Sequence, residues 1–274
     1  MKLRQIGAAL TGVMLAATLV ACGGSGQSQS SGNAPSGSGS SGDKTYTIAT
    51  DTTFAPFEFA DESNTYVGID IELLDAIAKD QGFKYNLDPV GFDMALQSVQ
   101  SGQADGVIAG MSITDDRKKV FDFSEPYYEA TVCAAAKSDG DVKSLDDLKG
   151  KNVAIKTGTM SADWAESMKD QYGYTVTQFE KSDLMYQDVL AGNSVACFED
   201  TPVMRYAIKT GMNLKVVSES EKDSKFAAPY GFAVNKGANA ELLTKFNTGL
   251  ANIKKDGTYD KIVNKYIQTE STQQ

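Results

Sequence analysis

The stretch MALQSVQSGQADGVIAGMSIT, from Met94 to Thr114, has a counterpart of the same design in MYQDVLAGNSVACFEDT, from Met185 to Thr201. Each stretch contains an amphipathic segment, a glycine turn, a short apolar run, and polar residues that end at a threonine. Apolar residues spaced near 3.6 predict a helix, and the short run of β-forming residues predicts a buried strand. The repetition predicts two lobes built in the same way.

The same alternation continues outward on both sides of these stretches. Strands are expected at residues 45–50, 85–87, 106–109, 152–156, 175–179 and 195–198. Helices are expected at residues 68–81, 92–100, 161–171 and 183–190, and two more are expected to open at Thr114 and Thr201. This order indicates an α/β fold with mainly parallel sheets. We therefore expect two doubly wound lobes whose open sheet ends face each other across a ligand cleft.

Two other segments fit the points where the chain crosses between the lobes. Ser124–Thr131 and Lys225–Tyr230 lack helical periodicity, and each contains a proline. They predict a two-stranded hinge about which the lobes close. The predicted lobe 1 then consists of residues 44–126 and 230–274, and lobe 2 of residues 127–229 with the hinge segments.

The N-terminal residues resemble an export signal. Lys2 and Arg4 precede an apolar stretch from Ile6 to Ala21. As a helix this stretch would be roughly 24 Å long, short of the roughly 30 Å hydrocarbon core of a membrane. It therefore indicates a signal peptide, residues 1–21, rather than a membrane span. The segment LVAC, ending at Cys22, resembles a bacterial lipobox, which predicts lipidation of Cys22; the alternative is an ordinary signal peptide with a chance cysteine.

A tether follows the expected lipidation site. In residues 23–42, fifteen of the twenty are Gly or Ser, so there is too little apolar surface for a folded core. Residues 22–43 are therefore interpreted as the lipidated cysteine and a flexible linker, with a root-mean-square reach of roughly 25 Å. A signal, a lipid site and a linker in this order place the folded part at the extracytoplasmic face of the membrane.

The composition excludes several classes of protein. The net charge is −10 and no Lys/Arg run interrupts the acidity, so a nucleic-acid partner is not expected. Histidine is absent, which excludes Ser-His-Asp and Cys-His catalysis and removes the commonest zinc ligand. Apart from Cys22, only Cys133 and Cys197 are present, and we expect buried thiols rather than a disulfide framework.

Charged and polar residues end several of the expected strands. The segments are Asp51–Phe57, Ala109–Arg117, Lys156–Ser161 and Phe198–Thr201. Since the carboxyl ends of the strands face one cleft, we expect these segments to share it. Arg117 would lie in the first turn of a helix capped by Thr114, where a cation opposes the helix dipole. An anion held between Arg117 and backbone N–H groups resolves that conflict, and the nearby carboxylates and aromatics suit a zwitterionic amino acid.

Other roles for these residues remain open at this point. Phe92 suits core packing as well as ligand contact, because it also lies on an apolar helix face. Asp51 and Asp200 could cap the segments that follow them. Glu199 suits a solvated rim as well as a ligand contact.

Seven short segments, in order along the chain, carry a specific resemblance. They are ATDTTFAPFEF (49–59), GIDI (68–71), SITDDRKK (112–119), DFS (122–124), KTGT (156–159), EDTP (199–202) and GTY (257–259). With these segments, residues 45–268 resemble the amino-acid-binding proteins of ABC importers, which have the type 2 periplasmic-binding-protein fold. The resemblance is greatest to glutamine-binding receptors.

The resemblance implies how the amino-acid backbone is bound. Arg117 would bind the α-carboxylate, together with the backbone N–H groups of Ser112 and Met160. The α-ammonium group would meet Asp200, the Ser112 hydroxyl and the Gly110 carbonyl.

It also implies the contacts of the ligand side chain. Asp51 and Lys156 would bracket a carboxamide, with Phe54 and Phe92 against its methylene groups. The remaining expected site residues are Ala109, Met111, Thr159 and Glu199. Glu199 departs from the pattern, because glutamine-binding relatives often have histidine there. Glutamine is the expected ligand, and glutamate, arginine and cystine are the alternatives.

The expected function is that of a monomeric, lipid-anchored receptor that binds a free amino acid and delivers it to the permease of an ABC importer. It needs no cofactor or metal. The rival hypothesis is a dehydratase on the same fold, with Glu199 as a general acid of raised pKa. A sensor protein of the same fold is a third alternative.

The lipid anchor can be tested directly. We expect Cys22→Ser to abolish incorporation of a clickable fatty acid, because the variant lacks the thiol that would receive the lipid. The signal peptide should also stay attached, as seen by mass spectrometry. Unchanged labelling of the variant would exclude Cys22 as the lipid site.

Overall fold

The computed structural model describes residues 44–267. The predicted signal peptide, Cys22 and the tether lie outside the described residues, so their interpretation stays a prediction. Within residues 44–267, no helix is both long enough and apolar enough to cross a membrane. Cys133 and Cys197 are both buried free thiols, as expected.

The first lobe is built on a five-stranded sheet. Its order is β5-β1-β6-β13-β7, with β1 at Thr45–Thr50, β5 at Lys84–Pro89, β6 at Gly106–Val107, β7 at Phe121–Phe123 and β13 at Ala233–Asn235. Strand β1 pairs in parallel with β5 and β6, whereas β13 runs antiparallel to β6 and β7. A small separate sheet joins β2 (Thr53–Phe54), β3 (Glu58–Ala60) and β4 (Tyr66–Val67).

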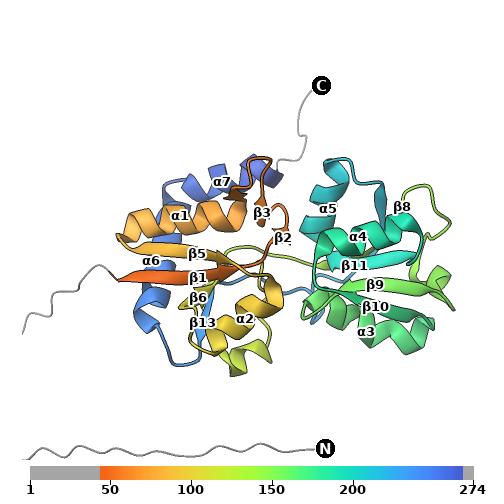
Figure 1. Ribbon diagram of the computed structural model, residues 1–274, viewed down its shortest axis with the longest axis horizontal. Coiled ribbons are helices and arrows are strands. Elements are labelled where there is room, and N and C mark those ends of the chain that lie inside the picture. Colours follow the sequence, from red (N-terminus) through yellow and green to blue (C-terminus); the bar gives the residue numbers. More distant parts are fainter. Residues whose placement is uncertain (1–43, 268–274) are drawn as a thin grey trace, which may run out of the picture. The chain divides into compact units, whose positions relative to one another are not determined.

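Helices cover both faces of this sheet (Figure 1). On one face α1 (Ile69–Gln81), α6 (Ala240–Lys255) and α7 (Thr258–Ile267) pack against one another. On the other face lies α2 (Phe92–Gln100), which contacts β1 and β6. Each face therefore encloses its own apolar cluster, the larger one under α1 and α6 and the smaller one under α2.

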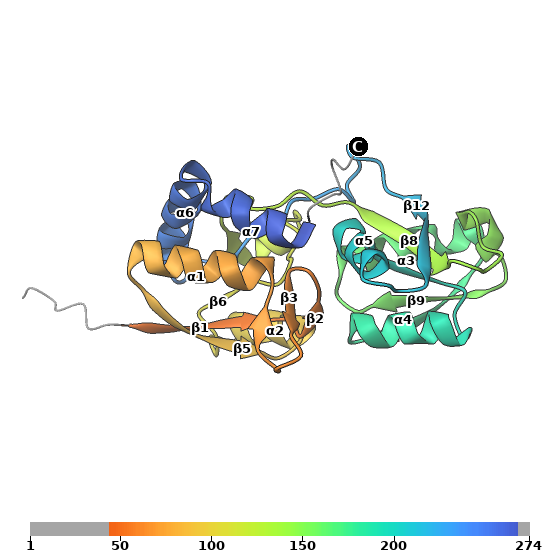
Figure 2. The same cartoon turned by 90° about the horizontal axis from the view of Figure 1, so that it is seen from above.

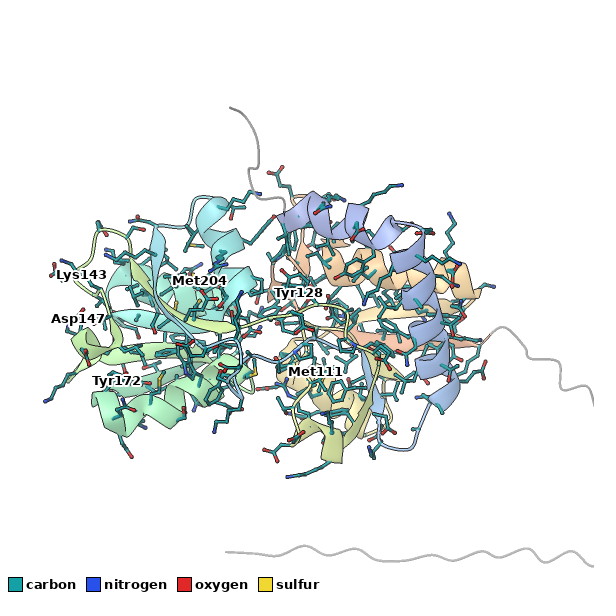
Figure 3. All side chains as sticks on the ribbon, turned by 180° about the vertical axis from the view of Figure 1, so that it is seen from behind. Met111, Tyr128, Lys143, Asp147, Tyr172 and Met204 are labelled. Carbon is teal, nitrogen blue, oxygen red and sulfur yellow. The ribbon has the colours of Figure 1, made fainter. Side chains whose placement is uncertain are left out.

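The second lobe repeats this plan. Its sheet has the order β10-β9-β11-β8-β12, with β8 at Val132–Lys137, β9 at Asn152–Lys156, β10 at Thr175–Phe179, β11 at Ala196–Asp200 and β12 at Leu214–Glu219. Helix α3 (Met160–Tyr172) covers one face, and α4 (Ser182–Ala191) and α5 (Thr201–Lys209) cover the other. Figure 3 shows this layering through Tyr172 and Met204, which lie on opposite faces of the sheet.

Two chain segments connect the lobes, one between β7 and β8 and the other between β12 and β13 (Figure 2). They pair through a short antiparallel bridge between Tyr128 and Tyr230. The Tyr230 N–H donates to the Tyr128 carbonyl at 2.7 Å, and the two rings stack with centroids 5.9 Å apart. The predicted fold class, two α/β lobes joined by a two-stranded hinge, is confirmed.

The structure differs from the expected elements in two respects. Strands β2, β3, β4, β7, β8, β12 and β13 were not predicted, and the antiparallel pairing of β8, β12 and β13 with their neighbours makes the two large sheets mixed. The helix expected to open at Thr114 is reduced to η1, a single 3₁₀ turn at Arg117–Lys119. Residues 115–119 read Asp-Asp-Arg-Lys-Lys and offer no apolar face to bury, so tertiary packing gives a longer helix no support. Thr114 still accepts the Arg117 N–H on its hydroxyl, at 3.3 Å.

Candidate functional site

A small cavity lies between the strand ends of the two lobes, with a volume of about 10 Å³. Its lining consists of Asp51, Phe54, Phe92, Ala109, Gly110, Ser112, Arg117, Lys156, Thr159, Met160 and Asp200. Every one of these belongs to the site expected from the sequence. The volume suffices for about one water molecule, so an amino acid can enter only if the lobes separate or side chains move.

An ion pair between Asp51 and Lys156 joins the lobes at this cavity. Asp51 follows β1 of the first lobe and Lys156 ends β9 of the second, and each side chain is only 1% exposed. Burial lowers the pKa of Lys156, but the charges of Asp51 and Glu199 outweigh it and raise that pKa above its ordinary value. Lys156 therefore stays charged. Its Nζ lies 4.8 Å from the centroid of the Phe54 ring, which favours the cation further.

Arg117 also reaches from one lobe to the other. Its Nη1 donates to the Ser112 carbonyl at 2.8 Å, and its Nη2 donates to the Gly158 carbonyl of the second lobe at 2.9 Å. The guanidinium lies over the Phe92 ring, 5.3 Å from its centroid. These contacts hold the planar group beside the cavity. Because a guanidinium has five N–H donors in a fixed fork, it can also bind a carboxylate.

The N-terminus of α3 lies at the cavity, just after the Gly158 carbonyl that Arg117 contacts. Thr159 caps this helix, since its hydroxyl oxygen accepts the Ala162 N–H at 3.1 Å. The same hydroxyl donates to the Lys156 carbonyl at 2.8 Å, which ties the helix start to the end of β9. Thr159 and Met160 both line the cavity. The first-turn N–H groups of a 13-residue helix therefore lie near the guanidinium.

Asp200 supplies a carboxylate at the end of β11 and is 3% exposed. Its Oδ2 accepts a hydrogen bond from the Tyr230 hydroxyl of the hinge at 2.5 Å. Its Oδ1 is buried and has no hydrogen-bond partner within residues 44–267. Burial, with help from the charge of Glu199, raises the pKa of Asp200 to about 7. A bound ammonium group would satisfy the second oxygen and keep the carboxylate charged.

Two expected site residues do not line the cavity. Met111 is fully buried in the core under α2, and its carbonyl accepts the Gly231 N–H at 3.0 Å. Glu199 is completely buried on the α4 side of the sheet, where its Oε2 accepts hydrogen bonds from Ser182 and Tyr186 at 2.8 Å each. The alternative of a solvated rim position is therefore wrong for Glu199. Alternation along β11 turns it away from the cavity while turning Asp200 toward it.

Tyr230 and a pair of buried acids behind the cavity were not anticipated as site residues. Tyr230 is fully buried, and its hydroxyl is directed at Asp200. The only sequence signal was its place in a segment expected to form the hinge. The acids, Glu58 and Asp70, belong to the motifs PFEF and GIDI, but neither motif predicts that the two carboxyl groups lie side by side in the fold.

With its two-lobed α/β architecture and a polar cavity at the facing strand ends, the molecule has the type 2 periplasmic-binding-protein fold. Residues 46–269 match the family described as bacterial extracellular solute-binding proteins, family 3. The chain belongs to this family, which confirms the resemblance noted from its motifs.

Individual relatives are similar over most of the chain. A probable histidine-binding protein of Neisseria gonorrhoeae is 32% identical over 98% of this chain and 97% of its own. The second substrate-binding domain of GlnP from Lactococcus lactis, solved in an open conformation, is 45% identical with a TM-score of 0.59, covering 84% of this chain and 98% of its own. An ancestral arginine-binding protein bound to glutamine is 42% identical with a TM-score of 0.73, covering 81% and 97%.

The interlobe ion pair predicts how the lobes respond when it is broken. Lys156→Ala leaves the Asp51 carboxylate buried without its cation, which is costly. Separation of the lobes lets water reach Asp51 and relieves that cost. We therefore expect Lys156→Ala to populate a more open arrangement of the lobes than the wild-type chain does.

Spin labels can measure this opening. Cysteines placed at Met94 of lobe 1 and Leu184 of lobe 2, which are 53% and 46% exposed, can carry the labels in a Cys22→Ser background. Double electron–electron resonance should then show a longer interlobe distance in Lys156→Ala. The matched control is Lys236→Ala, which removes an ion pair with Asp122 inside lobe 1 and should leave the distance unchanged. Equal distances in all three proteins would mean that the pair does not hold the lobes together.

Proposed function

We propose that this chain captures a free polar amino acid between its lobes, with L-glutamine as its preferred ligand, and delivers it to the permease of an ABC importer. The observation that carries the proposal is the placement of two cations and two carboxylates, from both lobes, around one small cavity. The cations are Arg117 and Lys156, and the carboxylates are Asp51 and Asp200.

One half of this set suits the part that all amino acids share. Arg117 and the start of α3 offer N–H donors to an α-carboxylate. The Oδ1 atom of Asp200, which has no partner in the described part of the chain, offers an acceptor to an α-ammonium group. Charges of opposite sign in the lining of one cavity fit the dipolar backbone of the ligand.

The other half suits a carboxamide. Opening of the lobes breaks the ion pair between Asp51 and Lys156. A ligand bound between them must then supply a hydrogen-bond partner to each side chain. A carboxamide does so, because its oxygen accepts from Lys156 and its nitrogen donates to Asp51. The rings of Phe54 and Phe92 lie beside the ammonium group of Lys156, where methylene groups can pack against them.

Arginine is the second candidate ligand within the same class. The negative charges of Asp51 and Glu199 favour a guanidinium, and one solved relative is named as an arginine-binding protein although it was bound to glutamine. Lys156 opposes this choice, because a cationic ligand would have to displace or face it. Glutamine leaves no group unmatched, so we place it first.

The dehydratase hypothesis receives less support from the position of Glu199. Burial does raise the pKa of this carboxyl group, as a general acid would require. Its oxygens, however, accept hydrogen bonds from Ser182, Tyr186 and its own neighbour's backbone, and it does not line the cavity. We propose binding and release of the ligand, without chemistry on it.

The cellular setting belongs to the same proposal. The lipid on Cys22 would hold the receptor at the outer face of the cytoplasmic membrane, where it would act as a monomer. The tether would let the folded part reach the permease. Closure of the lobes around the ligand is the shape that the permease would recognise.

The carboxylate clamp predicts a loss that does not depend on the ligand side chain. Arg117→Ala removes a charged partner from a desolvated carboxylate, a loss of roughly 2–5 kcal/mol. Calorimetric titration should show affinity reduced by tens- to thousands-fold for every amino acid that binds. Arg205→Ala is the matched control, because Arg205 is exposed and pairs with Glu219 away from the cavity. Affinity of Arg117→Ala within threefold of wild type would remove this residue from the clamp.

The side-chain half predicts the order of ligands. Glutamate would bring a second carboxylate against Asp51, and arginine would bring a cation against Lys156. We expect L-glutamine to bind at least tenfold more tightly than L-glutamate or L-arginine in calorimetric titrations. Lys156→Ala should narrow the advantage of glutamine over arginine. A titration in which arginine binds best would contradict the glutamine assignment while leaving amino-acid binding intact.

A further inference from the structure

Behind the cavity, two buried carboxyl groups of lobe 1 face each other. Glu58 begins β3 and Asp70 lies in the first turn of α1, and both are completely buried. Their carboxyl groups lie within hydrogen-bonding range of each other. Both oxygens of Glu58 and the Oδ1 of Asp70 have no hydrogen-bond partner within residues 44–267. Three buried acceptors at one place need a donor, because each unpaired acceptor costs free energy.

Backbone packing forces these two side chains together. The Ile69 N–H donates to the Pro56 carbonyl and the Asp70 N–H to the Phe57 carbonyl, both at 2.9 Å. Gly68 makes this approach possible, since a Cβ atom there would lie 2.1 Å from the Phe57 oxygen. The residue after Phe57 is Glu58, so its carboxyl group is brought beside that of Asp70.

The surroundings decide which of the two carries the charge. The Oδ2 of Asp70 accepts hydrogen bonds from the Gly110 N–H and the Tyr127 hydroxyl, both at 2.8 Å. The N-terminus of α1 also favours a negative charge on Asp70. Glu58 has no such donors among the described residues. Asp70 is therefore the better carboxylate, and Glu58 the better acid.

The other ionisable groups near the pair support the same assignment. Those around Glu58 are Asp70, Asp51 and Lys156, and those around Asp70 are Glu58, Tyr127 and Tyr259. Burial, then the charges of Asp70 and Asp51, raises the pKa of Glu58 well above its ordinary value against the opposing effect of Lys156. Burial also raises the pKa of Asp70, to about 6.

We propose that Glu58 and Asp70 share one proton at neutral pH, carried by Glu58 and donated to the Oδ1 of Asp70, and that this hydrogen bond holds Asp70 in the position that orients the Gly110 peptide at the ligand cavity. Gly110 lines the cavity, and Tyr127 belongs to the first hinge segment. Asp70 therefore connects the wall of the site to the hinge, and Glu58 acts as its positioning residue.

The shared proton has a thermodynamic signature. A carboxyl group whose pKa is higher in the folded state contributes stability that is present at low pH and lost as pH rises through the folded pKa. One proton taken up on folding lowers the folding equilibrium constant about tenfold for each pH unit. Chemical denaturation of the purified chain between pH 6 and pH 8 measures this slope. The amide N–H of Glu58→Gln donates to Asp70 without binding a proton from solution. The dependence of the unfolding free energy on pH should therefore be smaller in this variant by the contribution of one proton.

Two further variants complete the unfolding experiment. Asp70→Asn supplies an amide donor from the opposite side, so it should also lose the slope. Glu62→Gln, an exposed acid between β3 and β4, is the matched control and should follow the wild-type chain. The infrared band of protonated carboxyl groups at pH 7 should be weaker in Glu58→Gln than in wild type and Glu62→Gln, because one protonated group is missing. Equal slopes and equal spectra in wild type and Glu58→Gln would overturn the shared proton.

Ligand binding tests the positioning role, and this arm rests on the proposed function. At pH 7, calorimetric affinity for L-glutamine should stay close to wild type in Glu58→Gln, whose amide still donates to Asp70, and should fall in Glu58→Leu, which leaves the Oδ1 of Asp70 without a donor. Glu62→Gln should again follow wild type. Wild-type affinity in Glu58→Leu, or a loss of affinity in Glu58→Gln, would overturn the positioning role. If no amino acid binds wild type, the proposed function fails, while the unfolding slopes still decide whether the proton is shared.

Discussion

The closed arrangement of this protein depends on opposite charges that face each other from different lobes, with both side chains almost completely buried. Lys156 and Asp51 are each costly to bury alone, and their proximity offsets much of that cost. The bonds from Arg117 to Gly158 and from Tyr230 to Asp200 reach across to the second lobe at the same place. The groups that hold the lobes together are thus the groups that a ligand would engage. Binding exchanges one set of polar contacts for another, so selectivity follows from whichever ligand group is left unmatched.

Behind these charges lies a second layer of ionisable groups that no ligand could touch. Glu58 and Asp70 are sealed by the packing of β3 on the start of α1, yet Asp70 bonds to both the cavity wall and the hinge. The geometry of the site is therefore inherited from buried hydrogen bonds as much as from the side chains that line the cavity. Substitutions in this layer would change the site without removing a single ligand contact.

Much of the architecture follows from local patterns in the sequence. Helices α1 to α4 have amphipathic faces that the apolar spacing predicts. Charged or polar residues follow or end β1 and β9, and since parallel strands end at one edge of a sheet, these residues predict a shared site. The repeat from Met94 and from Met185 appears as α2 with β6 and α4 with β11. The antiparallel strands β8, β12 and β13 escaped prediction because they acquire their partners only when the chain returns from elsewhere. Three features of the site depend on tertiary packing in the same way: the orientation of Glu199, the contact of Tyr230 with Asp200, and the contact of Glu58 with Asp70.

The chain path has a consequence for the order in which the lobes can form. All five strands of the second sheet lie within residues 132–219, whereas the first sheet needs β13, more than a hundred residues after β6. A chain that becomes available to fold from the N-terminus onward can therefore complete the second sheet while the first still has an unpaired edge at β6. Antiparallel pairing of β13 with β6 and β7 closes that edge, and it does so only after the inserted lobe has passed. The lobe that begins first in the chain is the one completed last.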